Sequence, residues 1–269
     1  MPIITISRGV CSGGETLAER VAERLGARCL GREELTQRAA ASGVPESELQ
    51  DALLKSPGLL ERLWPRKRQY LALIRAALAE EASDGNLVYH GNAGHLLLQG
   101  AGPVLRVRIA APLAMRLSIA QERMGLSAET GAAFIARSDA ERRDWTRFLY
   151  GVEWGDPSLY DLVLNLNHTE MGDACEAVTG AAHLECFAWT PERRAQMKDF
   201  ALTSRVRAEL ALDRGTAQLD LEVSCRSGIV DIRGFVGSQR GIREVERVAG
   251  AVSGIRHLNL DELVVYHDV

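Results

Sequence analysis

Apolar positions in this chain follow two different spacings, and the N-terminal segment shows both of them. A β-branched run at 3–6 predicts a short buried strand, and a glycine-rich stretch at 9–16 follows it. Apolar residues then recur at helical spacing over 15–25, before Gly26 marks the predicted end of a helix. The pattern therefore predicts a strand, a glycine loop and an amphipathic helix.

Helical and strand-like segments continue to alternate as far as residue 166. The predicted helices cover most of 33–82, then 112–124 and 127–148. The predicted strands cover 86–90, 104–110 and 161–166. Strands that alternate with helices in this way indicate a parallel sheet with helices on both of its faces. We therefore predict an α/β fold with three layers, α/β/α.

A change of composition near Trp189-Thr190-Pro191 indicates a domain boundary. Beyond it, the patterns predict a helix, a hairpin of two strands, a second helix and a last strand, in the order αββαβ. These elements cover 202–212, 219–226, 229–235, 238–251 and 257–266. We predict an N-terminal domain over 1–190, a linker over 191–199 and a small C-terminal α/β domain over 200–269.

The composition limits the classes of protein to consider. At 269 residues with 46% hydrophobic residues, the chain is long enough for two domains. The net charge of −4 gives no overall attraction to nucleic acid, so nucleic acid is not an expected partner. Five scattered cysteines without paired-ligand spacing are typical of reduced thiols. Since we also recognise no long apolar span and no secretory leader, we expect a cytoplasmic protein without a structural metal.

The glycine loop carries the clearest chemical signal. Gly9 and Gly14 enclose four residues and are followed by Glu15 and Thr16, which is the spacing of a Walker A motif. In such a motif, loop amides and the N-terminus of the next helix face the phosphates of a nucleotide. Glu15 occupies the position where lysine normally neutralises the β- and γ-phosphates, so the site is suited to holding a nucleotide but poorly charged for transferring its phosphate. A tight turn without a ligand, with Glu15 as a solvated carboxylate, is the alternative.

A cluster of charged residues lies within two turns of the predicted helix at 127–148. Its members are Arg137, Asp139, Arg142 and Arg143. Their spacing allows at least two guanidinium groups to converge on one anion, with Asp139 orienting one of them. A solvated helix face is the alternative interpretation.

Several ordered blocks of residues 3–180 resemble the cytidylate kinase-like proteins, a branch of the P-loop nucleoside monophosphate kinases. These blocks are 4–8 with 12–14, 86–98, 111–113 with Arg116, 139–143, 151–157, and 160–162 with Asn165. The block Gly151-Val152-Glu153-Trp154-Gly155-Asp156-Pro157 is the most specific of them. Residues 200–267 resemble a BON domain, with Gly234 after the second strand and Gly254 before the third.

The kinase resemblance implies transfer of the γ-phosphate of ATP to a nucleoside monophosphate, with CMP as the first acceptor to test and Mg²⁺ bridging the phosphates. It assigns phosphate and metal binding to Gly13, Gly14 and Thr16, whose hydroxyl is the candidate Mg²⁺ ligand. It also assigns lid catalysis to Arg137, Arg142 and Arg143. The candidate nucleotide-binding residues are thus Arg8, Gly9, Ser12, Gly13, Gly14, Glu15 and Thr16. The BON resemblance implies a small ligand, a lipid headgroup or a protein partner, and a homo-oligomer is left open.

Three positions depart from what is common in the family. Glu15 replaces a basic residue, Asn92 replaces an arginine, and Gly31 replaces an acidic residue. A carboxylate about 4 Å from a phosphate opposes its binding by roughly 1 to 4 kcal/mol at effective dielectric constants of about 80 to 20, and Arg8 is a candidate substitute cation. Two hypotheses follow. One is an ATP-dependent phosphotransferase of the cytidylate kinase type with weakened activity, and the other is a catalytically degenerate nucleotide-binding sensor or scaffold with a ligand- or partner-binding BON module.

Overall fold

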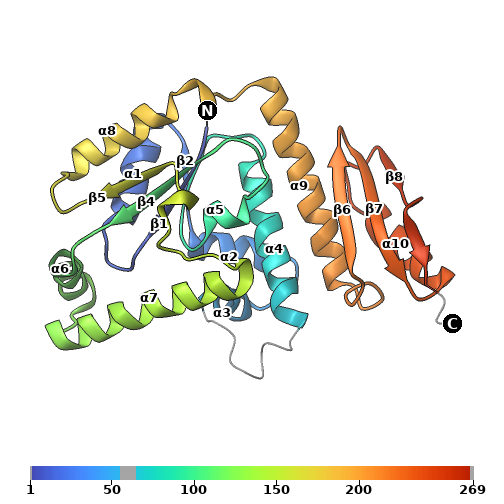
Figure 1. Ribbon diagram of the computed structural model, residues 1–269, viewed down its shortest axis with the longest axis horizontal. Coiled ribbons are helices and arrows are strands. Elements are labelled where there is room, and N and C mark those ends of the chain that lie inside the picture. The colour runs from blue at the N-terminus through green and yellow to red at the C-terminus, as the bar shows by residue number, and fades with distance from the viewer. Residues whose placement is uncertain (1, 55–64, 267–269) are drawn as a thin grey trace.

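The computed structural model describes residues 2–54 and 65–266, which form a large α/β body and a smaller C-terminal body (Figure 1). The larger body is built on a sheet of five strands in the order β2-β3-β1-β4-β5, and every neighbouring pair is parallel. The strands are β1 (Ile3–Arg8), β2 (Arg28–Gly31), β3 (Leu87–His90), β4 (Val104–Ala110) and β5 (Leu162–Asn165). The predicted parallel sheet is therefore confirmed.

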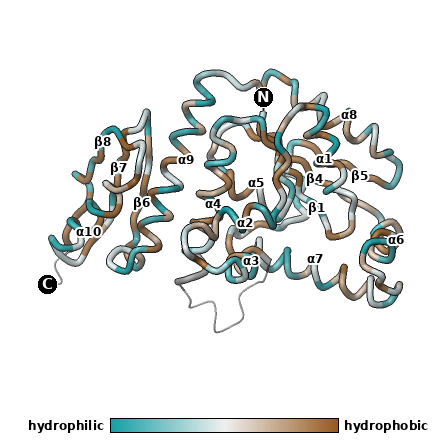
Figure 2. Tube along the Cα trace, turned by 180° about the vertical axis from the view of Figure 1, so that it is seen from behind, coloured by the Kyte–Doolittle hydropathy of each residue, from teal (hydrophilic) through white to brown (hydrophobic). Residues whose placement is uncertain are grey.

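Helices cover both faces of this sheet because alternate residues of β1 serve different cores. Ile4 and Ile6 pack with α1 (Gly14–Leu25) and α8 (Met171–Ala182). Ile3 packs on the opposite face, in the core that includes Trp145. That core is built from α2 (Arg32–Ala40), α3 (Glu46–Leu54), α4 (Pro65–Ala82), α5 (Gly94–Leu97) and α7 (Ala128–Tyr150). The three-layer prediction is confirmed, and Figure 2 shows brown, hydrophobic segments gathered along the central strands.

Several helices differ from their predicted limits. The long helical pattern at 33–82 is divided into α2, α3 and α4, and residues 55–64 of that prediction lie outside the described residues. The helix predicted at 112–124 is observed as α6 (Leu113–Met124). Helix α8 was not predicted, because its apolar face consists largely of small residues such as Ala174 and Cys175. Among the described residues, no helix is long and apolar enough to cross a membrane.

The C-terminal body has the predicted αββαβ order, with its last strand in two pieces. Strands β6 (Leu221–Arg226) and β7 (Ile229–Val236) form an antiparallel hairpin. Ser227 and Gly228 connect them with φ values of 52° and 78°, as a two-residue hairpin requires. Helix α10 (Gln239–Gly250) follows, and β8 (His257–Asn259) and β9 (Leu263–Val265) both pair in parallel with β7.

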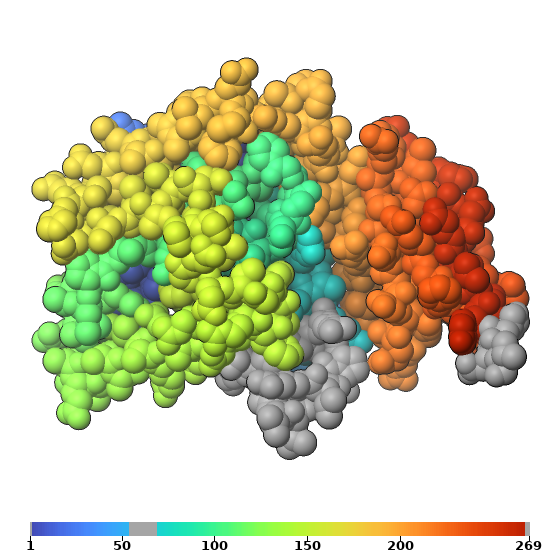
Figure 3. All heavy atoms as spheres, in the orientation of Figure 1, coloured from blue at the N-terminus to red at the C-terminus, as the bar shows by residue number. Residues whose placement is uncertain are grey.

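A single helix, α9 (Pro191–Leu212), joins the two bodies and belongs to both cores (Figure 1). It begins at Thr190, whose side chain accepts a hydrogen bond from the Arg193 amide, so the predicted linker at 191–199 is helical. One side of the helix packs against α4 through Met197, Ala201 and Ala208. The other side packs in the C-terminal core through Leu202, Val206 and Leu210. The space-filling view shows this orange helix between the blue-green atoms of α4 and the C-terminal sheet (Figure 3).

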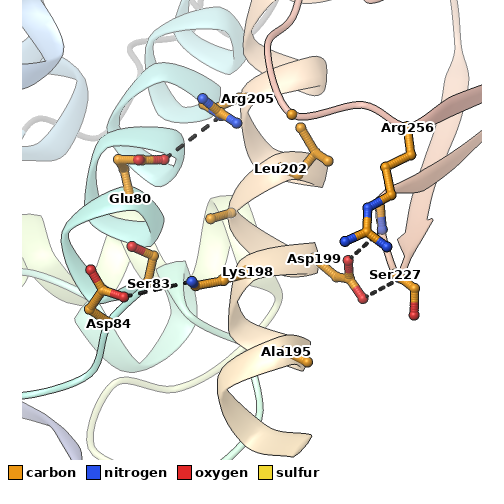
Figure 4. Close-up of a pocket in the computed structure, with 13 residues that line it drawn as sticks. Glu80, Ser83, Asp84, Ala195, Lys198, Asp199, Leu202, Arg205, Ser227 and Arg256 are labelled. Atoms are coloured by element: carbon orange, nitrogen blue, oxygen red, sulfur yellow. Dashed lines mark hydrogen bonds and ion pairs between the residues drawn. The ribbon is translucent and has the colours of Figure 1, made fainter. Parts of the chain in front are cut away.

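A polar groove of about 580 Å³ lies where α4, α9 and the C-terminal body meet (Figure 4). On its α4 side, Lys198 Nζ lies 4.0 Å from Asp84 Oδ1 and Arg205 Nε lies 3.7 Å from Glu80 Oε2. On the opposite side, the Asp199 carboxylate accepts hydrogen bonds from the backbone amides of the β6–β7 turn. The polar groups of the groove therefore join helices and cap a turn.

Candidate functional site

The loop between β1 and α1 is held in a wrapped conformation at the N-terminus of α1. Cys11 and Gly13 have φ values of 55° and 77°, in the left-handed region. The Ser12 hydroxyl donates to the Gly9 carbonyl oxygen at 2.9 Å, so this side chain stabilises the loop. The first turn of α1 presents backbone amides and the positive end of its dipole to this loop, an arrangement that favours anions.

Two arginine side chains lie directly on the glycines of the loop. A Cβ atom on Gly14 would come within 2.6 Å of Arg8 Cδ, and one on Gly9 would come within 3.0 Å of Arg116 Cζ. The Arg8 guanidinium reaches towards His90, with 3.5 Å between its Nη2 and the His90 Nδ1. These glycines therefore provide room for cationic side chains close to the backbone.

Arg116, on α6, is fixed by three hydrogen bonds. Its two terminal nitrogens donate to the carboxylate of Asp139 at 2.7 and 2.9 Å, and its Nε donates to the Val10 carbonyl oxygen at 2.9 Å. Asp139 thus orients Arg116 of α6, whereas the sequence spacing indicated an arginine on its own helix. Arg116 was not among the predicted site residues, although it belongs to one of the sequence blocks that carried the resemblance.

The arginines of α7 divide into one that reaches the loop region and two that do not. Arg142 donates a hydrogen bond to the Arg8 carbonyl oxygen. Burial, helped by the neighbouring Arg8 charge, lowers the pKa of Arg142 to about 10, so it remains positively charged at neutral pH. Arg137 and Arg143 are exposed, and within the described residues neither forms a hydrogen bond or ion pair with the loop.

Glu15 and Thr16 share one partner, Arg123, in the last turn of α6. The Arg123 Nη1 lies 3.1 Å from Glu15 Oε2, and its Nη2 donates to the Thr16 hydroxyl oxygen at 3.1 Å. The Glu15 and Arg123 side chains are 43% and 57% exposed. Arg123 carried no sequence signal, because it lies 108 positions from Glu15 and outside every recognised block.

The charges around the loop are predominantly positive. Arg116, Arg8, Arg123 and Arg142 all act to lower the pKa of the Cys11 thiol, but desolvation is larger and raises it. Cys11 is therefore not an activated thiolate. Four guanidinium groups and the two carboxylates of Glu15 and Asp139 surround the loop, and this donor set is suited to a polyanion. Figure 3 shows dark-blue atoms of the N-terminal segment at the bottom of a hollow between green and yellow-green parts of the chain.

A second glycine loop follows β3, next to the first loop, and is packed against its own strand. A Cβ atom on Gly91 would lie 2.5 Å from the Tyr89 hydroxyl oxygen, and one on Gly94 would lie 2.4 Å from Tyr89 Cδ1. The buried Asn92 side chain donates to the Leu53 carbonyl oxygen at 3.1 Å. The cavity between this loop, Arg8 and Arg142 has a volume of about 10 Å³, which is room for a single water molecule.

Asn92 and Gly31, two of the positions that depart from the family, both contact neighbouring parts of the fold. Asn92 fastens the loop to the last turn of α3, and Trp145 Nε1 donates to the adjacent Ala52 carbonyl oxygen at 2.7 Å. Gly31 ends β2, where an added Cβ would lie 3.4 Å from the His90 ring. Neither residue adds a charged group to the site.

The most specific sequence block, 151–157, closes over the ends of β1 and β4. Trp154 Nε1 donates to the Ser7 hydroxyl oxygen at 3.0 Å, and the Arg108 guanidinium lies 4.2 Å from the Trp154 ring centroid. Tyr160 donates to the Trp154 carbonyl oxygen, and its ring packs against the buried His95 ring at a tilted angle of 46°. Burial lowers the pKa of His95 to about 4, so this ring is neutral at pH 7. These aromatic residues therefore pack against the end of β1, from which the first loop begins.

Comparisons with known proteins identify a family for each of the two bodies of the chain. Residues 3–168 match the cytidylate kinase-like family, and residues 198–265 match the BON domain. A cytidylate kinase of Pyrococcus horikoshii is 27% identical over 164 residues, which are 61% of this chain and 79% of the relative. A cytidylate kinase of Ignicoccus hospitalis is 30% identical over 168 residues, which are 61% of this chain and 90% of the relative.

One solved structure supports the fold. It is an uncharacterized protein from Eubacterium ventriosum, with a TM-score of 0.55 and 18% sequence identity, and the match covers 67% of this chain and 97% of that one. At this identity the likeness concerns the fold alone.

Proposed function

Because this chain belongs to the cytidylate kinase-like family, we propose that it is an ATP-dependent phosphotransferase of the nucleoside monophosphate kinase type, with CMP as the first acceptor. The observation that carries the proposal is the wrapped loop at 9–14 with four guanidinium groups around it. This donor set is suited to the four negative charges of a nucleoside triphosphate. We place the protein in the cytoplasm, where both nucleotides are available.

In this proposal the loop glycines and the arginines hold the phosphates. Gly13 and Gly14 offer backbone amides at the start of α1, and Asp139 holds the Arg116 guanidinium beside the loop. Arg142 is charged and close to the loop, whereas Arg137 and Arg143 are exposed and, within the described residues, form no hydrogen bond or ion pair with the loop. Mg²⁺, when bound, neutralises phosphate charge, and the Thr16 hydroxyl is the side chain offered to it once Arg123 releases that oxygen.

A degenerate nucleotide-binding sensor is the second candidate function, and the loop after β3 favours it. The resemblance implies an arginine at the position of Asn92, but Asn92 is engaged with the Leu53 carbonyl oxygen beside a cavity of about 10 Å³. A protein with this arrangement binds the triphosphate at the first loop and recognises an acceptor weakly. The BON module then engages a small ligand, a lipid headgroup or a protein partner.

The deciding experiment measures phosphate transfer from ATP to CMP, dCMP, UMP and AMP, together with ATP binding by calorimetry. The enzyme proposal expects turnover of one acceptor well above a Thr16→Ala control. ATP binding without turnover supports the sensor, and absence of both contradicts both candidates. Flotation of the full chain with vesicles of anionic lipid tests the lipid headgroup option for the BON module separately.

A further inference from the structure

Arg123 connects the two elements that flank the proposed phosphate site. It lies in the last turn of α6, while Glu15 and Thr16 lie in the first turn of α1. Its two terminal nitrogens are each 3.1 Å from an oxygen of these residues. A guanidinium group has five N–H donors, so this position leaves others free to bind a second anion.

Stability does not account for this contact. Both side chains of the pair are more than one third exposed, at 43% and 57%. Exposed ion pairs contribute little to folding because water screens them and the long side chains lose entropy. Each charge also suits its own helix end, since acids favour N-termini and bases favour C-termini. That preference explains the two charges separately but does not explain their meeting beside the loop.

In a Walker A motif the residue after the last glycine is a lysine, whose side chain reaches the β- and γ-phosphates. In this chain the residue after Gly14 is Glu15, of opposite charge, and its carboxylate oxygen lies 3.1 Å from a terminal nitrogen of Arg123. We propose that Arg123 is the cation that binds the terminal phosphates of a nucleotide at this loop, and that Glu15 is a positioning residue that holds it there. The inference rests on the proposed phosphate site. It assigns to Arg123 and Glu15 together the role that a single lysine has in a Walker A motif.

Arg8, the substitute cation considered from the sequence, is less suited to this role. Its side chain is largely buried across Gly14, and its guanidinium points to His90 on β3. Burial also lowers the pKa of the Arg8 guanidinium. Arg123 is the more exposed of the two and touches both side chains that follow Gly14.

The test is calorimetric titration of the full chain with a non-hydrolysable ATP analogue at low salt. We expect Arg123→Ala to raise Kd at least about tenfold, the value of one charge-assisted hydrogen bond, and Arg123→Lys to recover part of it. The matched control is Arg24→Ala, which removes another exposed arginine of a 3.0 Å ion pair, with Glu176, at the far end of α1. It should leave Kd within about twofold of wild type.

Two further variants test whether the positions act together. Glu15→Lys in the Arg123→Ala background should restore Kd to within about threefold of wild type, because it returns a cation to the same place. Glu15→Gln should tighten binding in the Arg123→Ala background, where it removes only repulsion. In the wild-type background it should not, because it also releases Arg123.

The outcomes separate this inference from the proposed function. Wild-type binding with no difference between Arg123→Ala and Arg24→Ala overturns the role of Arg123 and leaves the phosphate site standing. Equal tightening by Glu15→Gln in both backgrounds overturns the positioning role of Glu15. A wild-type chain that binds no triphosphate overturns both the inference and the proposed function. Thermal melting of each variant establishes that it is folded.

Discussion

The loops after β1 and β3 lie side by side and use their glycines in opposite ways. Gly9 and Gly14 are approached by the side chains of Arg116 and Arg8. Gly91 and Gly94 are approached by the fully buried ring of Tyr89. The first loop therefore presents backbone and positive charge, whereas the second is filled by its own strand. A glycine in a sequence indicates that another group approaches the backbone closely. Whether the position serves a ligand or the core depends on the chemistry of that group.

Among substitutions that distinguish the two loops, Gly94→Ala is expected to have the largest effect on stability. The new methyl group would lie 2.4 Å from Tyr89 Cδ1, whose ring is fully buried. We expect the free energy of unfolding in urea to fall by about 3 kcal/mol. Gly180→Ala in α8 is the control, since nothing lies within 4 Å of its Cβ, and it should gain up to about 1 kcal/mol. A loss below about 1 kcal/mol for Gly94→Ala would show that the second loop is not packed as described.

A pH effect of comparable size is expected from His95, just after the second loop. Its pKa is about 4 in the folded chain, because burial disfavours the charged ring, and about 6.5 when unfolded. Between these values only the unfolded chain binds the proton, so stability is complete above pH 6.5 and falls as the pH is lowered to about 4. The loss approaches roughly 3 kcal/mol. Urea unfolding across this range measures it, and His95→Leu should remove this part of the slope; an unchanged slope contradicts the assignment.

A smaller effect is expected for Asn92→Ala. The substitution leaves the buried Leu53 carbonyl oxygen without its 3.1 Å donor, which costs about 1 to 3 kcal/mol of unfolding free energy. Nucleotide affinity should not change, because Asn92 faces α3. The exposed Asn167 provides a control, whose replacement by alanine should alter stability by under about 0.5 kcal/mol. Loss of nucleotide binding with unchanged stability would instead place Asn92 in the site.

The smallest effect on stability is expected at the first loop. Arg123→Ala removes an exposed pair with Glu15, so the unfolding free energy should change by less than about 1 kcal/mol. Urea unfolding measured beside the Gly94→Ala series gives the contrast directly. A loss above about 2 kcal/mol would mean that the first loop, like the second, uses its side chains mainly for folding.

Local patterns were sufficient to predict most of the fold. The strand predicted at 104–110 is observed as β4 over the same residues, and the first helix starts within one residue of its prediction. The missed elements lacked such patterns: β2 has four residues and is only partly buried, and α8 buries small side chains. Periodicity identifies an element only when large apolar residues mark one face.

The site was less predictable because its contacts join distant parts of the sequence. Asp139 could be placed beside arginines of its own helix, but its partner Arg116 lies 23 residues earlier on α6. Glu15 was recognised as the wrong charge for a Walker loop, but nothing near it in the sequence pointed to Arg123. Helical spacing reports neighbours on one helix, whereas the meeting of α1, α6 and α7 depends on the packing of the whole sheet.

Helix α9 contributes side chains to the cores of both halves of this protein. Each half obtains one wall from the same 22-residue rod, so an excised C-terminal piece starting at 200 would lack the first turns of its own helix and bare the side of Ala201 and Ala208. Its counterpart ending at 190 would leave α4 uncovered. Because the two halves share this helix, we expect calorimetry to record one melting transition in place of two.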